Sequence, residues 1–210
     1  MEPASNIGGD LFGAFFVRDR LLFFCIGDVS GHGIASALFM ARAIGLLRIL
    51  AMTTFQPDRL LTKLNDSLCV NNDTNLFLTI FCAFLNLDTG RMTYSNGGHC
   101  PPILEAAGEL SDLAIPKGPL VGAFAGVRYA SMTKILDRED ALYCYTDGVT
   151  EAQNASGEEF SEDRCKSWMG QRPLQPLQSV LDGIRRQVAI FSGTEILEDD
   201  FTMLALRRKM

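Results

Sequence analysis

Residues 25–36 read CIGDVSGHGIAS, in which an apolar stretch ends at the carboxylate Asp28 and a glycine-rich turn leads into a helix-like segment. Aspartate is common at strand ends and in turns, because its side chain accepts hydrogen bonds from nearby backbone N–H groups. A single aspartate in this place therefore has an ordinary explanation as a turn residue. A chemical role becomes more plausible only if other carboxylates occupy similar places.

The segments around this turn have clear periodicities. Apolar, β-prone runs at 14–17 and 21–26 flank a short charged turn and predict a hairpin. Residues 34–54 are apolar nearly all round and predict a helix that must be covered on more than one side. Pro57 begins a second, amphipathic helix that reaches about Val70.

The middle of the chain changes to a β pattern, and helices return in the last third. The patterns predict strands at 78–87, 92–95, 103–104, 128–136, 141–145 and 201–206, and helices at 161–169 and 176–190. There is no internal repeat, linker or low-complexity tract. This order predicts a single α+β domain in which helices pack on sheets.

Composition argues against several classes of protein. The chain has 210 residues and a net charge of -6, and its only run of basic residues is at 207–209, whereas a nucleic-acid-binding face is normally basic. The six cysteines contain no CxxC pair, which is typical of buried thiols in a reducing cytosol. We therefore expect a cytoplasmic protein with no nucleic-acid partner.

One apolar window, from Gly33 to Phe55, is long enough to suggest a membrane span. Arg42 and Arg48 lie inside it. Each arginine near the centre of a bilayer would cost roughly 2.5–3.5 kcal/mol. We therefore expect a buried helix and no membrane span in this chain.

Aspartates recur at the predicted strand boundaries. Asp10 follows two glycines before the first hairpin, Asp147 ends an apolar strand in LYCYTDGVTE, and Asp199-Asp200 precedes the last strand. If these boundaries and Asp28 meet at one edge of the sheets, their charges cannot all persist without a cation. Oxygen ligands without Cys or His at ligand spacing favour Mg²⁺ or Mn²⁺ over zinc. Together the aspartates predict a metal site, although each alone fits a turn.

Five motifs, in order along almost the whole chain, resemble those of the SpoIIE/RsbU-type bacterial phosphatases, a branch of the metal-dependent (type 2C-like) protein serine/threonine phosphatases. The motifs are GGD at 8–10, GDVSGHG at 27–33, YSNGGHCPP at 94–102, YTDGVTE at 145–151 and DDFT at 199–202. The resemblance implies a four-layer αββα sandwich of two mainly antiparallel sheets flanked by helix pairs. It also implies that residues 1–210 are one phosphatase domain that lacks its first strand and any upstream sensory or receiver module.

The resemblance further implies a site with two Mn²⁺ or Mg²⁺ ions. Asp28 matches the carboxylate that bridges both ions, and the Val29 carbonyl is a neighbouring ligand. Asp147 and Asp199 match the remaining direct carboxylates on one ion. Asp10 matches an acidic residue that binds a metal directly or through water.

Three further residues have candidate supporting roles. Asp200 is expected behind the direct ligands. His32 could protonate the leaving alkoxide or could instead order the glycine turn. His99 is expected to be a structural, hydrogen-bonding residue beneath the site.

Two such ions, about 3.5–4 Å apart, can activate a shared water and direct it at phosphorus. The resemblance therefore implies direct hydrolysis of phosphoserine or phosphothreonine. It suggests a STAS-domain anti-sigma-factor antagonist in a partner-switching pathway as the substrate. A cysteine-dependent phosphatase is not indicated, because no cysteine has the glycine-rich, arginine-ended loop that cradles phosphate.

Two alternatives come from other classes. A phosphatase-like fold could be retained as a catalytically weak or inactive binding module. GGDLF at 8–12 is also similar to the signature of diguanylate cyclases, which leaves the other four motifs unexplained.

The apolar helix at 34–54 raises a question about partners. We expect it either to contact a dimer mate or an upstream regulator, or to lie sandwiched between the sheet and the second helix. In the first case, movement of the helix would shift Asp28, to which it is tethered.

Overall fold

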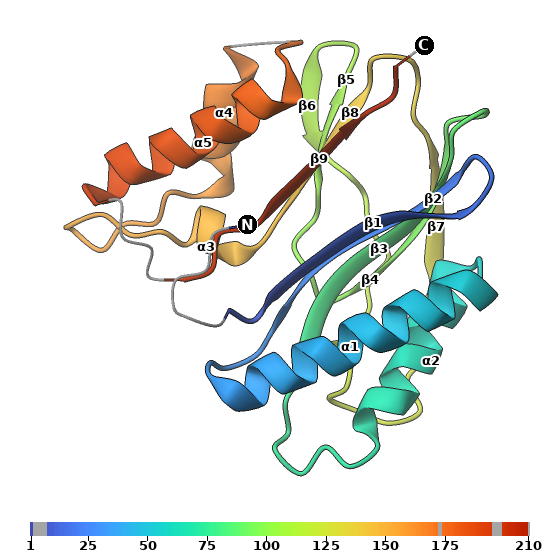
Figure 1. The fold of residues 1–210 in the computed structure, drawn as a ribbon. Coiled ribbons are helices and arrows are strands. Elements are labelled where there is room, and N and C mark those ends of the chain that lie inside the picture. The colour runs from blue at the N-terminus through green and yellow to red at the C-terminus, as the bar shows by residue number, and fades with distance from the viewer. Residues whose placement is uncertain (2–7, 172–173, 195–198, 210) are drawn as a thin grey trace.

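The computed structural model describes residues 1, 8–171, 174–194 and 199–209 and contains two antiparallel sheets that face each other (Figure 1). The five-stranded sheet has the order β1 (Asp10–Arg18), β2 (Leu21–Val29), β3 (Leu78–Asn86), β4 (Arg91–Gly97) and β7 (Ser131–Ile135). The four-stranded sheet has the order β6 (Glu109–Asp112), β5 (Ile103–Ala106), β8 (Ala141–Tyr145) and β9 (Met203–Arg207).

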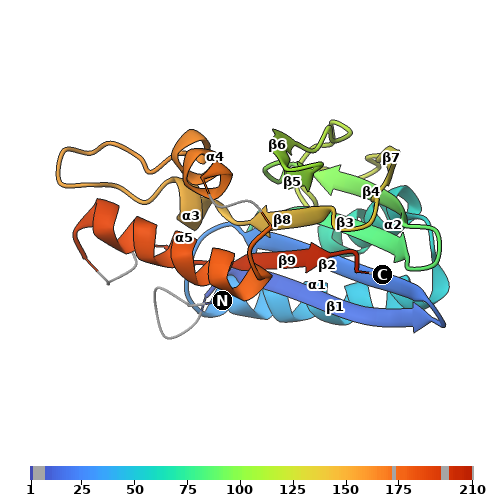
Figure 2. The same ribbon diagram turned by 90° about the horizontal axis from the view of Figure 1, so that it is seen from above.

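Helices cover the outer faces of both sheets, as Figure 1 shows and Figure 2 shows again from above. The five-stranded sheet is covered by α1 (Ile34–Thr53) and α2 (Pro57–Cys69). The four-stranded sheet is covered by α4 (Glu162–Gly170) and α5 (Leu177–Ser192), and the short α3 (Asp147–Thr150) follows β8. The predicted four-layer αββα sandwich is therefore confirmed.

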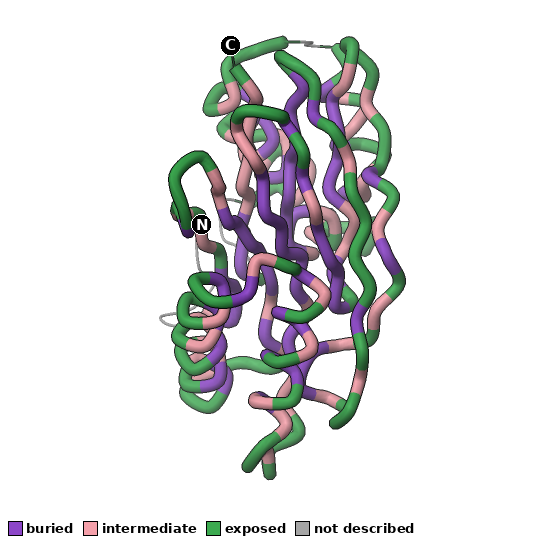
Figure 3. Tube along the Cα trace, turned by 90° about the vertical axis from the view of Figure 1, so that its right-hand side faces the viewer, coloured by how far each residue is buried: buried purple, intermediate pink, exposed green. Residues whose placement is uncertain are grey.

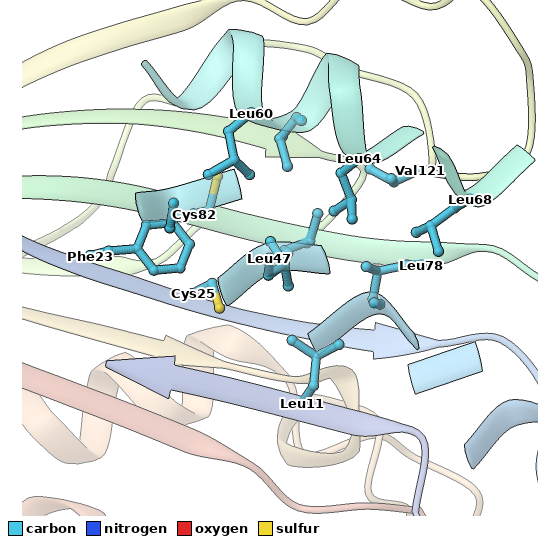
Figure 4. Close-up of a cluster of buried hydrophobic side chains, with 14 of the residues drawn as sticks. Leu11, Phe23, Cys25, Leu47, Leu60, Leu64, Leu68, Leu78, Cys82 and Val121 are labelled. Carbon is cyan, nitrogen blue, oxygen red and sulfur yellow. The ribbon is translucent and has the colours of Figure 1, made fainter. Parts of the chain in front are cut away.

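Three apolar clusters fill the spaces between these four layers. Strand β2 contributes side chains to two of these clusters. Phe23 and Cys25 face the helices, while Phe24 and Ile26 face the second sheet. A strand buried on both faces has a continuous apolar sequence, which explains LLFFCI at 21–26. In Figure 3 the buried residues run along the strands, and Figure 4 shows Leu47 of α1 near Cys25 of β2 and Leu60 of α2 near Cys82 of β3.

Most predicted elements are present, with four main differences. Strand β7 begins at Ser131 instead of 128, β9 begins at Met203 instead of 201, and β6 and α3 were not predicted. A four-residue helix is barely longer than one turn, so it leaves no periodic pattern in the sequence.

Helix α1 is covered by the described residues on one face only. Its buried residues are Ser36, Phe39, Ala43, Leu47 and Ala51, while Ile34 and Leu38 are 73% and 67% exposed. Ile49 and Met52 are exposed as well. By length and composition, α1 is apolar enough to cross a membrane. The prediction that this helix is covered on more than one side is therefore not met by the residues that the structure describes.

Candidate active site

The aspartates singled out in the sequence gather at one end of the sandwich. Asp10 and Asp28 lie directly opposite each other on β1 and β2. Asp147 begins α3 just after β8, and Asp199-Asp200 precedes β9. In Figures 1 and 2 the start of β1, α3 and the start of β9 lie toward this same end. The fold thus brings together carboxylates from four separate segments of the chain.

The carboxylates are close enough to affect one another's ionisation. Burial, followed by the negative charges of Asp10, Asp147, Asp199 and Asp200, raises the pKa of Asp28 to about 8. Burial also raises the pKa of Asp10 to about 7, opposed by hydrogen bonding from Thr202 and Thr146 and helped by the charges of Asp200 and Asp147. The pKa of Asp199 is raised by burial and by its acidic neighbours. The cluster therefore favours any cation that could compensate its charge.

Glycines allow the backbone to approach this closely. A Cβ atom on Gly8 would clash with the Asp200 carboxylate, and one on Gly148 would clash with the Asp200 carbonyl oxygen. A Cβ atom on Gly9 would lie 2.8 Å from the Val29 carbonyl oxygen and 3.0 Å from Asp28 Oδ1. The Val29 carbonyl, a predicted metal ligand, therefore lies beside the Asp28 carboxylate. The glycines of the GGD and TDG motifs are required by close packing within the site.

Asp200 is engaged with the backbone of the GGD motif. Its Oδ2 accepts hydrogen bonds from the N–H of Gly9 at 2.6 Å and, more weakly, from that of Asp10 at 3.3 Å. The side chain is buried. Asp200 thus joins the start of β1 to the segment before β9, in a position that suits the supporting role expected for it.

Thr146 is a functional residue that the sequence reasoning missed. Its hydroxyl donates to Asp10 Oδ2 at 2.8 Å and accepts from the N–H of Thr202 at 3.2 Å. It is fully buried between β8 and Asp147. The sequence indicates only that a hydroxyl residue precedes Asp147 in the YTDG stretch. It does not indicate the partners of that hydroxyl, because they are distant in sequence.

His99 connects the two sheets beneath the carboxylates. Its Nε2 lies 3.0 Å from the carbonyl oxygen of Tyr145, and its Nδ1 lies 2.9 Å from the hydroxyl of Thr79, which pairs with Asp28 across β2 and β3. Because a carbonyl only accepts, Nε2 carries the proton and Nδ1 accepts from Thr79. Burial lowers the pKa of His99 to about 4, so the ring is neutral at pH 7.

His32 is exposed, in the loop between β2 and α1. It makes no hydrogen bond or ion pair with the residues that the structure describes. Its role as a proton donor to the leaving group stays a prediction.

The available ligand atoms suit a hard divalent cation. One oxygen each of Asp10, Asp147 and Asp199 accepts a protein hydrogen bond, and Asp28 accepts none from the described residues. The donors are all oxygen atoms, which is the chemistry preferred by Mg²⁺ and Mn²⁺. Within the described ranges, no three Asp, Glu, His or Cys side chains are arranged closely enough to hold an ion as they stand. Binding would therefore require carboxylates to turn toward a common point.

The family model for stage II sporulation protein E (SpoIIE) matches residues 18–209. Protein IcfG of Synechocystis sp. is 26% identical over 235 residues, which cover 99% of this chain and 37% of IcfG. Phosphoserine phosphatase RsbU of Bacillus subtilis is 29% identical over 211 residues, which cover 99% of this chain and 62% of RsbU. The chain thus spans less than two thirds of the length of either relative.

The SiaA-PP2C domain of Pseudomonas aeruginosa has the same fold, with a TM-score of 0.85 and 18% identity over 98% of this chain and 83% of that one. The αββα architecture and the ordered motifs agree with the match to the family model. Because that match covers most of the sequence, the chain belongs to the SpoIIE family.

Proposed function

We propose that this chain is a metal-dependent protein phosphatase that hydrolyses phosphoserine or phosphothreonine esters in the cytoplasm. The observation that carries the proposal is the cluster of five aspartates from four segments of the chain. Burial and the charges of the other four raise the pKa of its member Asp28 to about 8. Similarity to phosphoserine phosphatase RsbU over 99% of the chain supports the same activity.

Asp28, the Val29 carbonyl, Asp147 and Asp199 would hold two Mn²⁺ or Mg²⁺ ions, and Asp10 would bind directly or through water. When bound, such ions neutralise phosphoryl oxygens and make a water molecule nucleophilic. The chain's own contribution is to hold the ligands in place. Thr146 fixes Asp10, Asp200 fixes the glycine backbone, and His99 ties the strand opposite Asp28 to the end of β8.

We further propose that the substrate is a phosphorylated STAS-domain anti-sigma-factor antagonist in a partner-switching pathway. The support is the family membership and the similarity to RsbU.

Hydrolysis of p-nitrophenyl phosphate and of a phosphorylated STAS-domain protein tests the proposal. We expect activity with Mn²⁺, loss of activity with EDTA, and loss in Asp28→Ala. Asp88→Ala is a suitable control, because Asp88 is exposed at a hairpin turn and its carboxylate pairs with the exposed Arg20. Its backbone contacts to the Asn86 and Arg208 side chains do not depend on the carboxylate. Absence of activity with every divalent metal would instead support a phosphatase-like binding module.

We also propose that residues 34–54 contact a dimer mate or an upstream regulator. The exposed Ile34, Leu38, Ile49 and Met52 lie on α1, which begins six residues after Asp28. Contact there would shift α1 and the loop that joins it to Asp28, and so change metal binding. A chain that is monomeric in light scattering and already fully active without regulation would contradict this proposal.

A further inference from the structure

A cavity of about 270 Å³ lies beside the aspartate cluster. One wall is the segment that follows α3, with Glu151, Gln153 and Asn154, and the other is α5, with Arg185 and Ser192. The cavity also reaches Gly148 and Asp199, so it is continuous with the candidate active site. Its volume is close to the lower end of ligand pockets, roughly 300–1,000 Å³.

The wall formed by residues 151–160 is an ordered hairpin-like loop. Asn154 Oδ1 accepts hydrogen bonds from the N–H groups of Ser156 at 2.9 Å and Glu158 at 3.0 Å, and Phe160 N–H donates to the Ala152 carbonyl at 2.8 Å. The buried Phe160 ring packs against Phe191 of α5, with ring centres 5.6 Å apart. Figures 1 and 2 show this loop beside α5. The cavity walls are thus fixed relative to each other, which lowers the entropic cost of binding.

The lining has polar groups that could meet a polypeptide. Gln153 carries an amide that both donates and accepts. The Asn154 amide is instead bonded within its own loop, and the Ser192 hydroxyl donates to backbone carbonyls at the end of α5. Arg185 is the one basic residue among the described lining residues, and its guanidinium lies 5.6 Å from the Phe201 ring centre. Mixed donors and acceptors match the alternating N–H and C=O groups of a main chain better than they match a single charged ligand.

We infer that this cavity is a peptide subsite, which holds residues next to the phosphorylated serine or threonine of a protein substrate. The inference rests on the proposed function. If the phosphoryl group binds at Asp28, Asp147 and Asp199, a chain leaving it on the Asp199 side enters the cavity directly. The Gln153 amide and the Arg185 guanidinium then donate to substrate carbonyls, while Glu151 accepts from substrate N–H groups.

Ala155→Trp tests the subsite, because Ala155 lines the cavity and a large side chain there would fill part of it. Ser156→Trp is the matched control, since Ser156 is the next residue of the same exposed loop and does not line the cavity. With Mn²⁺, we expect Ala155→Trp to lower the ratio of phosphorylated-casein to p-nitrophenyl phosphate hydrolysis about fivefold or more. Ser156→Trp should keep this ratio within about twofold of wild type.

Equilibrium binding separates this inference from the proposed activity. A fluorescein-labelled phosphoseryl peptide from casein, added in EDTA, should bind wild type about fivefold or more tightly than it binds Ala155→Trp. Gln153→Ala, which removes an amide without adding bulk, should also weaken binding, and circular dichroism melting would show that both variants fold. Equal binding by wild type and both variants, or no binding by wild type, would overturn the subsite. Peptide binding without hydrolysis would count against the phosphatase activity alone.

Discussion

Replacing Asp28 by asparagine should make the metal-free protein more stable while removing its activity. The substitution keeps the shape of the side chain but takes one negative charge from the centre of the cluster. Burial, then the charges of Asp10, Asp147, Asp199 and Asp200, raises the pKa of Asp28 from 3.8 to about 8. A carboxyl whose pKa is raised by folding stabilises the protein at low pH and loses that contribution as the pH rises toward the folded value.

The size of the gain follows from the same shift. Between pH 3.8 and pH 7, at about 1.4 kcal/mol per unit, the loss of stability has an upper bound of about 4 kcal/mol. Because Asp28 is only half-buried, solvent screening reduces this, and we expect a gain of about 1–3 kcal/mol at pH 7. Near pH 4 the gain should disappear, because the wild-type carboxyl is then protonated in the folded state.

Urea unfolding in EDTA at pH 7 and pH 4 measures the effect. Asp88→Asn is the control, because this exposed carboxylate pairs with the exposed Arg20 and its loss should change stability by less than about 1 kcal/mol. An Asp28→Asn protein that is no more stable than wild type at pH 7 would refute the reasoning that burial and mutual repulsion of these carboxylates destabilise the metal-free protein.

Three other substitutions test the supporting contacts. His99→Ala should cost about 2–4 kcal/mol of stability, because it removes a buried hydrogen bond, a partly buried one and the volume of the ring. Burial holds the pKa of His99 near 4, so this cost, measured by urea unfolding, should shrink as the pH falls from 6.5 to 4. Gly148→Ala should lower the melting temperature and the activity, because its Cβ would clash with Asp200, whereas Gly45→Ala on α1, with nothing nearby, should stabilise by about 0.5–1 kcal/mol. Thr146→Val should cost about 1–2 kcal/mol and raise the Mn²⁺ concentration needed for half-maximal activity; unchanged metal dependence would exclude a role in holding Asp10.

Local sequence predicted the elements that have long, regular patterns. The β2–turn–α1 segment and α2 were found because their apolar periods extend over many residues. The pairing of Asp10 with Asp28 was also accessible, since both lie nine residues from Asp19 in the hairpin turn. That the chain lacks its first strand or an upstream module stays a prediction.

Other features depend on contacts that no local pattern records. Nothing near Thr146 indicates that its hydroxyl meets Asp10, which is 136 residues away in sequence. For α1 the sequence left two alternatives open, a face that contacts a partner or a helix sandwiched within the chain, because an apolar helix sequence does not show how much surface the rest of the chain can cover.

The hydrogen bond between Gly9 and Asp200 joins residues separated by 191 positions in the chain. Ribosomal synthesis proceeds from the N-terminus, so the GGD motif emerges long before its carboxylate partner exists. A nascent chain therefore cannot complete the aspartate cluster until residue 200 has been added. A truncation before Asp199 would leave a polypeptide with most of both sheets but without the full set of acidic groups.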